Sequence, residues 1–379
     1  MMTSPVRLRG ITWDAPRGVW PLDGTVDLVR ERLGVDLTWD RRSLWSFGEE
    51  PFADYTSTYD LLVIDHPLVG YGVERDLIVP FGQVEQEVAA LDAVGRSTQS
   101  YAHNGLIWAL PVDAAAQVCV WRPDLVATPP RSWSELFEFA RESRQVIAAL
   151  SPVNVLCLTF AIIANTGSDP LEHGIDTEDY AAALEILAEL ASLVPDWCFD
   201  TNPIAVLDLL SSSQEWAFAA PLFGYSNYQR PGFREYLLQF GDFLEGAPGK
   251  GPVGSTLGGT GIAVSSKSSN PALAVQVARL LTDPAVQSTI YVTEGGQPAA
   301  RSAWTGDLAN GLTRGYFRDT IATLEGAYVR PNRNGMELFQ PAAGELLHHH
   351  LRARTDRSAT IDQLRRLFEE SVTLPMTGA

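Results

Sequence analysis

The feature that most constrains the fold is a continuous apolar run within Tyr59–Pro67, which ends in the polar sequence Asp-His-Pro. A run that is apolar on both faces is typical of a strand buried inside a parallel sheet. Two further strands are predicted before it, at Arg7–Trp13 and Gly34–Asp40, with a helix at Asp23–Leu33 between them. This alternation of strand and helix predicts an α/β fold with a parallel sheet.

Polar and aromatic residues follow each of these predicted strands. They are Trp13-Asp14, Asp40-Arg41-Arg42 and Asp65-His66. In open α/β sheets, ligands bind beyond the carboxyl ends of the strands. We therefore expect these residues to share one edge of the sheet and to include ligand-binding groups.

The second half of the chain continues the alternation. Gly105–Leu125 is interpreted as two strands around a Pro-Val-Asp bend, and Asp176–Leu193 as an amphipathic helix. Another helix is predicted to begin at Ser132, where Glu135 three residues later completes a capping pattern. Trp216–Tyr228 is predicted to be a strand that runs into an aromatic loop.

Charge and cysteine content exclude several classes of protein. The formal net charge of −18 disfavours nucleic acid and anionic membranes as partners. The three cysteines are far apart and form no Cys-x-x-Cys pair, which argues against a metal cluster. We interpret them as buried free thiols, with one disulfide as the alternative.

Motifs for catalysis or cofactor binding are missing from the sequence. The glycine-rich stretch Gly251–Gly261 lacks the Gly-Lys-Ser/Thr ending of a phosphate-binding loop and is interpreted as a hinge. His348, His349 and His350 would point about 100° apart on a helix, so we interpret them as a solvated face rather than a metal site. No cofactor, no metal and no catalytic residue is predicted.

Five segments give the chain an end-to-end resemblance to a known family. They are YDLLVID, GLIWALPVD followed by VCVWRPDL, PPRSWSELFEFAR, LGGTGIAVSSKSSNPALAVQVARLLTDPAVQ and GGQPAARSAW. In this order and spacing they resemble the extracellular solute-binding proteins of carbohydrate ABC importers, the group that includes maltose-binding proteins. The resemblance implies a two-lobed periplasmic-binding-protein fold of type II, with two or three hinge crossings and a ligand cleft between the lobes.

The resemblance also implies where the lobes divide. Lobe 1 would comprise residues 1–111 and 261–301, and lobe 2 residues 112–260 and 302–379. The crossings are expected near Leu110–Asp113, Gly258–Gly261 and Pro298–Trp304, where glycine and proline suit backbone that bends while the lobes stay rigid.

Aromatic faces combined with polar side chains suit a sugar, which presents both C–H groups and hydroxyls. The ligand-binding residues predicted on this basis are Trp13, Asp14, Arg17, Arg42, Asp65, Trp121, Tyr225, Asn227, Tyr228, Gly259, Thr260 and Arg330. The arginines would also suit an acidic group on the ligand.

Each candidate has a structural alternative. A tryptophan beside a strand is more often a core residue, Asp65 can cap the next helix, and Arg41-Arg42 can form a surface ion-pair cluster with Asp40.

The predicted function is that of a non-enzymatic receptor that closes around a small carbohydrate, polyol or sugar acid. Its partners would be the membrane subunits of an ABC importer, and it would act as a monomer. The alternative is a cytoplasmic enzyme or ligand sensor that reuses the binding-protein fold. The first twenty residues show no apolar stretch of signal-peptide length. An exported location is therefore expected if a signal has been removed, and a cytoplasmic one if the chain is complete.

Overall fold

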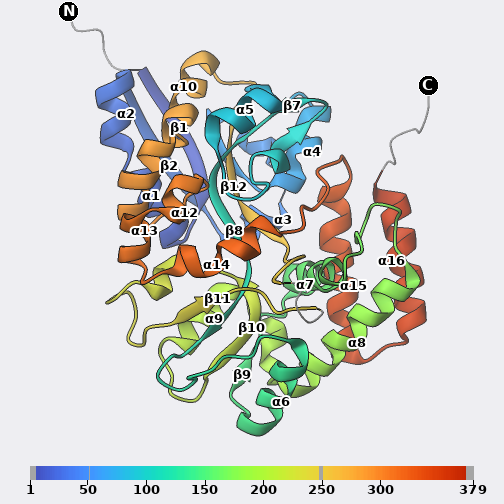
Figure 1. The fold of residues 1–379 in the computed structure, drawn as a ribbon. Helices are drawn as coiled ribbons and strands as arrows, with labels where there is room; N and C mark the ends of the chain where they lie inside the picture. Colours follow the sequence, from blue (N-terminus) through green and yellow to red (C-terminus); the bar gives the residue numbers. More distant parts are fainter. Residues whose placement is uncertain (1–5, 51, 247–250, 373–379) are drawn as a thin grey trace, which may run out of the picture. The chain divides into compact units, whose positions relative to one another are not determined.

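The computed structural model describes residues 6–50, 52–246 and 251–372, which form two compact units (Figure 1). The first unit comprises the chain up to Ala114 together with Gly258–Arg318 and Arg330–Glu337. The second comprises Ala115–Leu257, Asp319–Val329 and the chain from Leu338 onward. Residues 1–5, 51, 247–250 and 373–379, which the predicted lobes include, lie outside the described residues.

Two strands carry the chain between the units. Strand β8 (Leu110–Trp121) leaves the first unit at Ala114, and β12 (Leu257–Ser265) re-enters it at Gly258. Both positions lie within a few residues of the predicted crossings. Two later helices, α14 (Tyr316–Glu325) and α15 (Met336–Ala353), also belong partly to each unit.

The third predicted boundary, at residues 301 and 302, differs from the structure. Residues 302–318 belong to the first unit, because Trp304 is fully buried there and donates a hydrogen bond from Nε1 to the Pro298 carbonyl at 2.7 Å. The Trp304 ring also packs against Phe317, with centroids 5.1 Å apart. This aromatic cluster keeps α12 (Arg301–Thr305) and α13 (Asp307–Leu312) in the first unit.

The sheet of the first unit confirms the predicted parallel order. Strand β1 (Val6–Trp13) pairs in parallel with β2 (Val35–Arg42) on one side and β3 (Leu61–Ile64) on the other. Strand β12 then pairs with β3 in the antiparallel direction. Every residue of β3 is buried, as its apolar sequence predicted.

The predicted helix Asp23–Leu33 is confirmed as α2 (Val26–Leu33), and a further helix, α1 (Pro16–Asp23), precedes it where a helix was not predicted. Pro16 favours the first turn of α1, and Thr25 separates the helices by donating from Oγ1 to the Leu22 carbonyl at 2.7 Å. The other elements that lie within this unit are α3 (Leu44–Glu49), η1 (Ala53–Tyr55), η2 (His66–Leu68), α4 (Val69–Glu74), β4 (Ile78–Val79), β5 (Gly82–Gln83), α5 (Val84–Leu91), η3 (Gln99–Tyr101), β6 (Ala102–His103), β7 (Leu106–Ile107), α10 (Pro271–Leu281), α11 (Pro284–Val286) and η6 (Gln287–Tyr291).

The sheet of the second unit is built on β8. Strands β10 (Phe218–Phe223) and β11 (Gln239–Gly241) pair with β8 in the antiparallel direction, and β9 (Val146–Ile147) pairs with β10 in parallel. All twelve residues of β8 are buried.

The predicted bend at Pro-Val-Asp in β8 is wrong, because the strand runs straight through Pro111–Asp113. Glutamine side chains from elsewhere in the first unit donate hydrogen bonds to the backbone carbonyls of this segment. Gln287 Nε2 donates to the Val112 carbonyl and Gln297 Nε2 to the Ala114 carbonyl, each at 2.8 Å. These hydrogen bonds satisfy an extended backbone, so no turn is needed.

The helices of the second unit begin largely where the sequence indicated. Ser132 caps α6 (Trp133–Ser143) by accepting from the Glu135 amide, and Asp176 caps α8 (Thr177–Leu193) by accepting from the amides of Glu178 and Asp179. Helix α8 packs against α6, α7 and α16, as Figure 1 shows. The remaining elements that lie within this unit are α7 (Pro152–Thr166), η4 (Asp196–Asp200), α9 (Pro203–Leu210), η5 (Ser226–Gln229) and α16 (Arg357–Ser371).

Helix α15 corrects the interpretation of the three histidines as a solvated face. Only His349 is exposed. His348 Nε2 lies 3.0 Å from the Phe199 carbonyl, and the buried His350 places Nδ1 3.0 Å from Thr355 Oγ1. The histidines therefore anchor the helix to two neighbouring segments.

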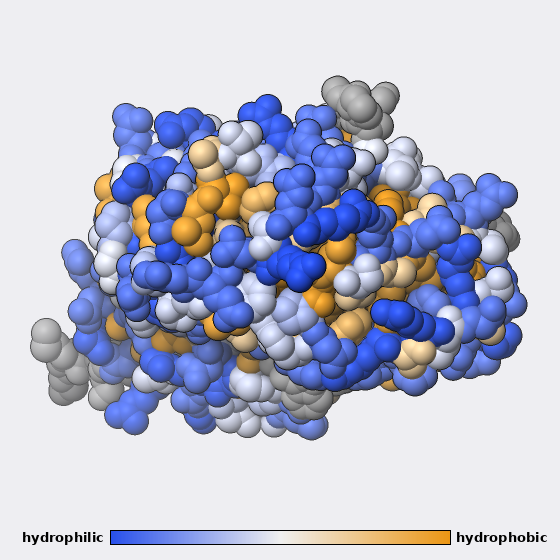
Figure 2. Space-filling model, turned by 90° about the horizontal axis from the view of Figure 1, so that it is seen from below, coloured by the Kyte–Doolittle hydropathy of each residue, from blue (hydrophilic) through white to orange (hydrophobic). Residues whose placement is uncertain are grey.

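The three cysteines are buried free thiols, as predicted. None of the helices in the described ranges combines the length and apolar character that crossing a membrane requires. Figure 2 shows one face of the molecule, on which hydrophilic residues predominate around scattered apolar groups.

Candidate functional site

The predicted edge exists in the first unit, where β1 and β2 end side by side. Trp13 and Arg42 are register partners, and the Asp14 amide donates to the Arg42 carbonyl at 2.7 Å. Trp13 is only 3% exposed, and its ring lies 5.3 Å from that of Phe47. A side chain at Gly18 would overlap the Trp13 ring, so the helix α1 packs closely on it. Trp13 therefore has a packing role, while Asp14 is exposed.

Arg17 forms a buried ion pair at this edge. It lies in α1 and reaches Asp113, at the start of β8, with Nε 2.8 Å from Oδ2 and with Nη2 on Oδ1. Both side chains are almost fully buried. Burial raises the pKa of the Asp113 carboxyl, and the Arg17 guanidinium opposes that rise.

Asp65 forms a second ion pair, with the buried Arg330, although the Asp65 side chain itself is 18% exposed. Nη2 of Arg330 donates to both carboxylate oxygens, at 3.1 and 2.8 Å. Asp65 also accepts from the His66 amide at 2.8 Å, so its capping role is confirmed. Burial alone would raise the pKa of Asp65, but Arg330 and His66 hold it well below its usual range.

His66 and Tyr101 lie beside these pairs. The two rings meet edge to face with centroids 6.2 Å apart, and His66 Nδ1 is 3.2 Å from Asp65 Oδ1. Burial lowers the pKa of His66, which keeps the ring neutral. Burial and the negative charges of Asp65 and Asp113 raise the pKa of Tyr101 well above its ordinary value. We call Arg17, Asp65, His66, Tyr101, Asp113 and Arg330 the strand-end cluster.

Asp113 and Tyr101 were not among the predicted site residues. For Asp113 a signal was present, because a single carboxylate inside an otherwise apolar strand requires a buried partner. For Tyr101, in the short helix η3, the sequence held no comparable signal.

Arg42 is buried at the same edge but is bonded differently. Its guanidinium donates from Nη2 to the Val63 carbonyl at 3.1 Å and from Nη1 to the Ser46 carbonyl at 3.5 Å. It lies over the rings of Phe47 and Tyr55, at 5.2 and 5.0 Å from their centroids. Arg41 does form a surface ion pair, but with Asp23 at 3.2 Å, whereas the predicted partner Asp40 pairs with Arg9.

Gly259 and Thr260 lie in β12 near the start of the strand. Gly259 has φ of +97°, and a side chain there would come within 2.3 Å of the Asp113 carbonyl oxygen. Only glycine fits that position. Thr260 is 3% exposed, and its Oγ1 has no hydrogen-bond partner within the described part of the chain.

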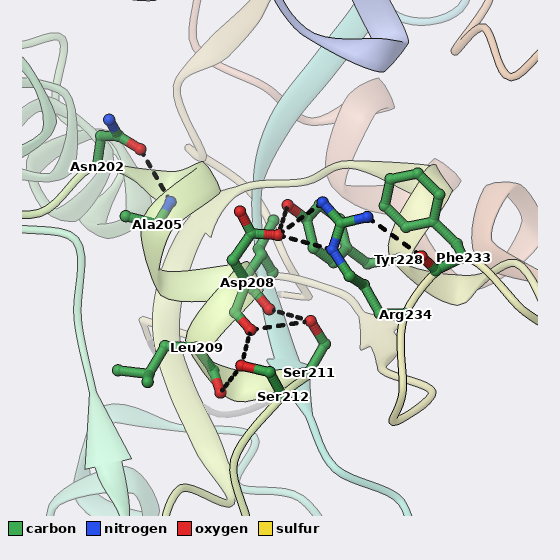
Figure 3. Close-up of polar contacts among 10 residues, drawn as sticks. Asn202, Ala205, Asp208, Leu209, Ser211, Ser212, Tyr228, Phe233 and Arg234 are labelled. Atoms are coloured by element: carbon green, nitrogen blue, oxygen red, sulfur yellow. Dashed lines mark hydrogen bonds and ion pairs between the residues drawn. The ribbon is translucent and has the colours of Figure 1, made fainter.

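In the second unit, Tyr225, Asn227 and Tyr228 lie together in and just before η5, directly after β10. All three are buried. Tyr228 donates its hydroxyl to Asp208 Oδ1 at 2.7 Å, and Arg234 Nε donates to the same oxygen at 2.8 Å (Figure 3). The Tyr228 hydroxyl is therefore committed to α9. Burial raises the Tyr228 pKa, and the acceptor Asp208 raises it further.

Trp121 lies in β8, where it pairs with Gln239 of β11 as well as with a residue of β10. It pairs with Phe218 at the start of β10, whereas Phe223 at the end of β10 pairs with Gln117. Trp121 instead lines a separate pocket of about 290 Å³, whose other lining residues include Arg131, Asp242 and Phe243. Within residues 6–50, 52–246 and 251–372, no group of three or more His, Cys, Asp or Glu residues is placed to hold a metal ion.

Comparisons with known proteins agree with this fold. A model of the bacterial extracellular solute-binding protein family matches residues 52–309, more than half of the chain. A search of curated proteins found no match.

Several solved structures are similar over almost the whole chain. Maltose-bound MalE3 of T. maritima is 14% identical, with a TM-score of 0.82 and coverage of 95% of this chain and 98% of that one. A solute-binding protein from Agrobacterium radiobacter K84, in complex with ribitol, is 17% identical, with a TM-score of 0.79 and coverage of 97% and 98%. One from Thermotoga lettingae TMO, bound to α-D-tagatose, is 14% identical, with a TM-score of 0.80 and coverage of 97% and 100%.

The predicted two-lobed α/β binding-protein fold is thus confirmed. The chain belongs to the family of bacterial extracellular solute-binding proteins.

Proposed function

We propose that this protein is the solute-binding receptor of an ABC importer and that its ligand is a small carbohydrate, polyol or sugar acid. The observation that carries the proposal is the family match over residues 52–309. The ligands named for the similar structures, maltose, ribitol and α-D-tagatose, are all rich in hydroxyl groups and support this class of compound.

The first unit offers polar groups suited to such a ligand. Fixed donors and acceptors at the carboxyl ends of parallel strands can orient hydroxyl groups, and ligands of α/β sheets bind at such ends. Ligand-binding roles are proposed in this unit for Trp13, Asp14, Arg17, Arg42, Asp65, Gly259, Thr260 and Arg330.

In the second unit, ligand-binding roles are proposed for Tyr225, Asn227, Tyr228 and Trp121. Tyr225 and Asn227 are stronger candidates than Tyr228, whose hydroxyl already donates to Asp208. Trp121 is the weakest candidate, because the pocket that it lines includes none of the other three residues.

The protein is proposed to bind its ligand without changing it. The enzyme alternative predicts a titratable pair with shifted pKa values, and Asp65 with His66 is such a pair. However, both shifts fix one protonation state near neutral pH, with Asp65 ionised and His66 neutral. A general acid or base works best when its pKa lies near the working pH, so this pair is better suited to hold the fold.

A location outside the cytoplasm, a monomeric state and contact with importer membrane subunits complete the proposal. The location is supported by the family description, which names extracellular proteins. Fractionation of cells that express the natural gene tests the location, because an enzyme or sensor that reuses the fold would stay in the cytoplasm.

The function itself is tested by a thermal-shift screen of the purified protein against monosaccharides, oligosaccharides, polyols and sugar acids. A compound that binds only the folded state stabilises it by about 2.7 kcal/mol at a hundredfold excess over its dissociation constant. A raised melting temperature with the compound recovered unchanged is the expected result. Conversion of the compound would overturn the receptor proposal in favour of the enzyme.

A further inference from the structure

The buried arginines at the strand ends of the first unit are neutralised unequally. Arg17 is paired with Asp113 through two nitrogens, and Arg330 is paired with both oxygens of Asp65. Each of these two positive charges is therefore matched by a negative charge, which is fully buried at Asp113 and partly buried at Asp65. Paired burial of this kind removes most of the electrostatic cost of taking a guanidinium out of water.

Arg42 is the exception. It is 6% exposed, yet no carboxylate lies within 4.0 Å of its guanidinium among the side chains that the structure describes. Its Nε has no hydrogen-bond partner within the same residues, and its bond from Nη1 to Ser46 is long, at 3.5 Å. Part of the donor capacity of Arg42 thus remains unused at a buried position, and none of the described carboxylates pairs directly with its charge.

The neighbours of Arg42 reduce this cost without neutralising the charge. The faces of Phe47 and Tyr55 attract a cation, but they carry no net charge. Glu50 is the nearest acidic influence, and it is bonded to Ser46 rather than to Arg42. In agreement with this geometry, burial lowers the pKa of the Arg42 guanidinium, and Tyr55 and Glu50 offset only part of that shift.

We infer that the ligand carries a carboxylate and that Arg42 binds it. This inference rests on the proposed function and narrows the ligand from hydroxyl-rich compounds in general to sugar acids of the uronic or aldonic type. A guanidinium matches the two oxygens of a carboxylate in a planar, charge-assisted contact, which a neutral sugar hydroxyl cannot provide. A bound sugar acid would give Arg42 the counter-ion that Asp113 gives Arg17.

The alternative role for Arg42 is purely structural. Its bonds to the carbonyls of Ser46 and Val63 join α3 to β3, and a guanidinium can do this without a ligand. The ligand-binding role and the structural role of Arg42 predict different results when its positive charge is removed by substitution. Loss of a structural contact changes stability but does not discriminate between an acid and its neutral analogue.

The test measures affinity by isothermal titration for pairs of compounds that differ in the acid group. Suitable pairs are D-galacturonate with D-galactose, D-glucuronate with D-glucose, and D-mannonate with D-mannitol. We expect at least one acid to bind ten times or more tightly than its neutral partner. Arg42→Gln should remove that preference, Arg42→Lys should keep part of it, and Arg30→Gln should leave it unchanged. Arg30 is a matched control because it is an exposed arginine of the same unit, in α2, and pairs with Asp36 near the start of β2, whereas Arg42 ends that strand.

Three results would overturn the inference. One is a neutral compound that binds the wild-type protein as tightly as its acid or more tightly, which leaves the receptor proposal intact. Another is an equal loss of affinity for acid and neutral compounds in Arg42→Gln. The third is the absence of binding to every acid and neutral compound, which would overturn the proposed function as well. Because the first comparison uses the wild-type protein, it does not depend on whether Arg42→Gln folds.

Discussion

The strand-end cluster of the first unit and the loop of the second unit, Tyr225–Gln229, are organised by different forces. Both regions are buried and both follow strands of their own sheets. The cluster is held by ion pairs between residues far apart in the chain, with Arg17 and Asp113 separated by 96 positions and Asp65 and Arg330 by 265. The loop contains no charged residue, and Tyr228 bonds to Asp208 only 20 positions away.

This difference predicts which region makes the stability of the protein depend on charged side chains and on pH. Coulombic interactions between buried groups are strong, and each depends on the protonation state of its partner. Hydrogen bonds of neutral hydroxyl and amide groups are weaker and do not titrate near neutral pH. We therefore expect the first unit to be sensitive to charge removal and to pH, and the second-unit loop to be sensitive to neither.

The largest effect is expected for Arg17→Gln. The substitution leaves the Asp113 carboxylate buried without its guanidinium, and breaking a buried pair in this way costs about 3–5 kcal/mol. Urea unfolding followed by circular dichroism measures the loss. Adding Asp113→Asn to Arg17→Gln should recover part of the stability, because the second substitution removes the stranded charge.

Arg30→Gln is the matched control for charge removal. Arg30 is 60% exposed and bonds to Asp36 at the surface, so its loss should change the unfolding free energy by less than about 0.5 kcal/mol. An equally small loss in Arg17→Gln would contradict the view that ion pairs organise the strand-end cluster.

The next effect is a dependence of stability on pH that arises from His66. Burial lowers the pKa of His66 in the folded protein. Below about pH 6.5, His66 is therefore protonated in the unfolded chain more readily than in the folded protein. Its contribution is fully present above that pH and is lost as the pH falls, by up to about 1.4 kcal/mol per pH unit. Asp65, whose pKa is also lowered, adds a further loss below about pH 3.9.

Unfolding free energies of the wild type and of His66→Gln between pH 7.5 and 5 test this expectation. The unfolding free energy of the wild type should fall more steeply with decreasing pH than that of His66→Gln. The contributions of the other histidines cancel in this comparison, because both proteins contain them. Parallel curves would mean that His66 takes up its proton as readily in the folded state as in the unfolded state. The expectation that the strand-end cluster makes stability depend on pH would then be wrong.

Much of the fold could be predicted because it depends on local patterns. The apolar run Leu61–Ile64 indicated a buried strand, and Ser132 with Glu135 indicated the start of α6. The strand ends were also placed correctly at one edge, since parallel strands in register bring Trp13 and Arg42 together.

The failures share one physical cause, which is that distant groups decided a local conformation. Pro111–Asp113 has the sequence of a bend but is extended, because Gln287 and Gln297 bond to the adjoining backbone from more than 170 positions away. The pairing of Arg330 with Asp65 cannot be read from either residue alone. For the same reason, the sequence could not tell that Arg17 would have a buried acidic partner, while Arg42 would have none among the side chains that the structure describes.

The smallest effect concerns the second-unit loop, where Tyr228→Phe removes the hydroxyl that donates to Asp208. Asp208 keeps its bond from Arg234, so no acceptor is stranded, and a loss of about 1 kcal/mol is expected. Urea unfolding at pH 7.5 and at pH 5.5 should give the same loss at both. Tyr236→Phe is the matched control, because its hydroxyl accepts a more exposed bond from Gln214 and its removal should cost less. A loss in Tyr228→Phe that reached about 3 kcal/mol, the size expected for a broken buried ion pair, would erase the contrast between the units. It would mean that Asp208 and Arg234 extend a charged network into the loop, and that the loop responds to charge as the strand-end cluster does.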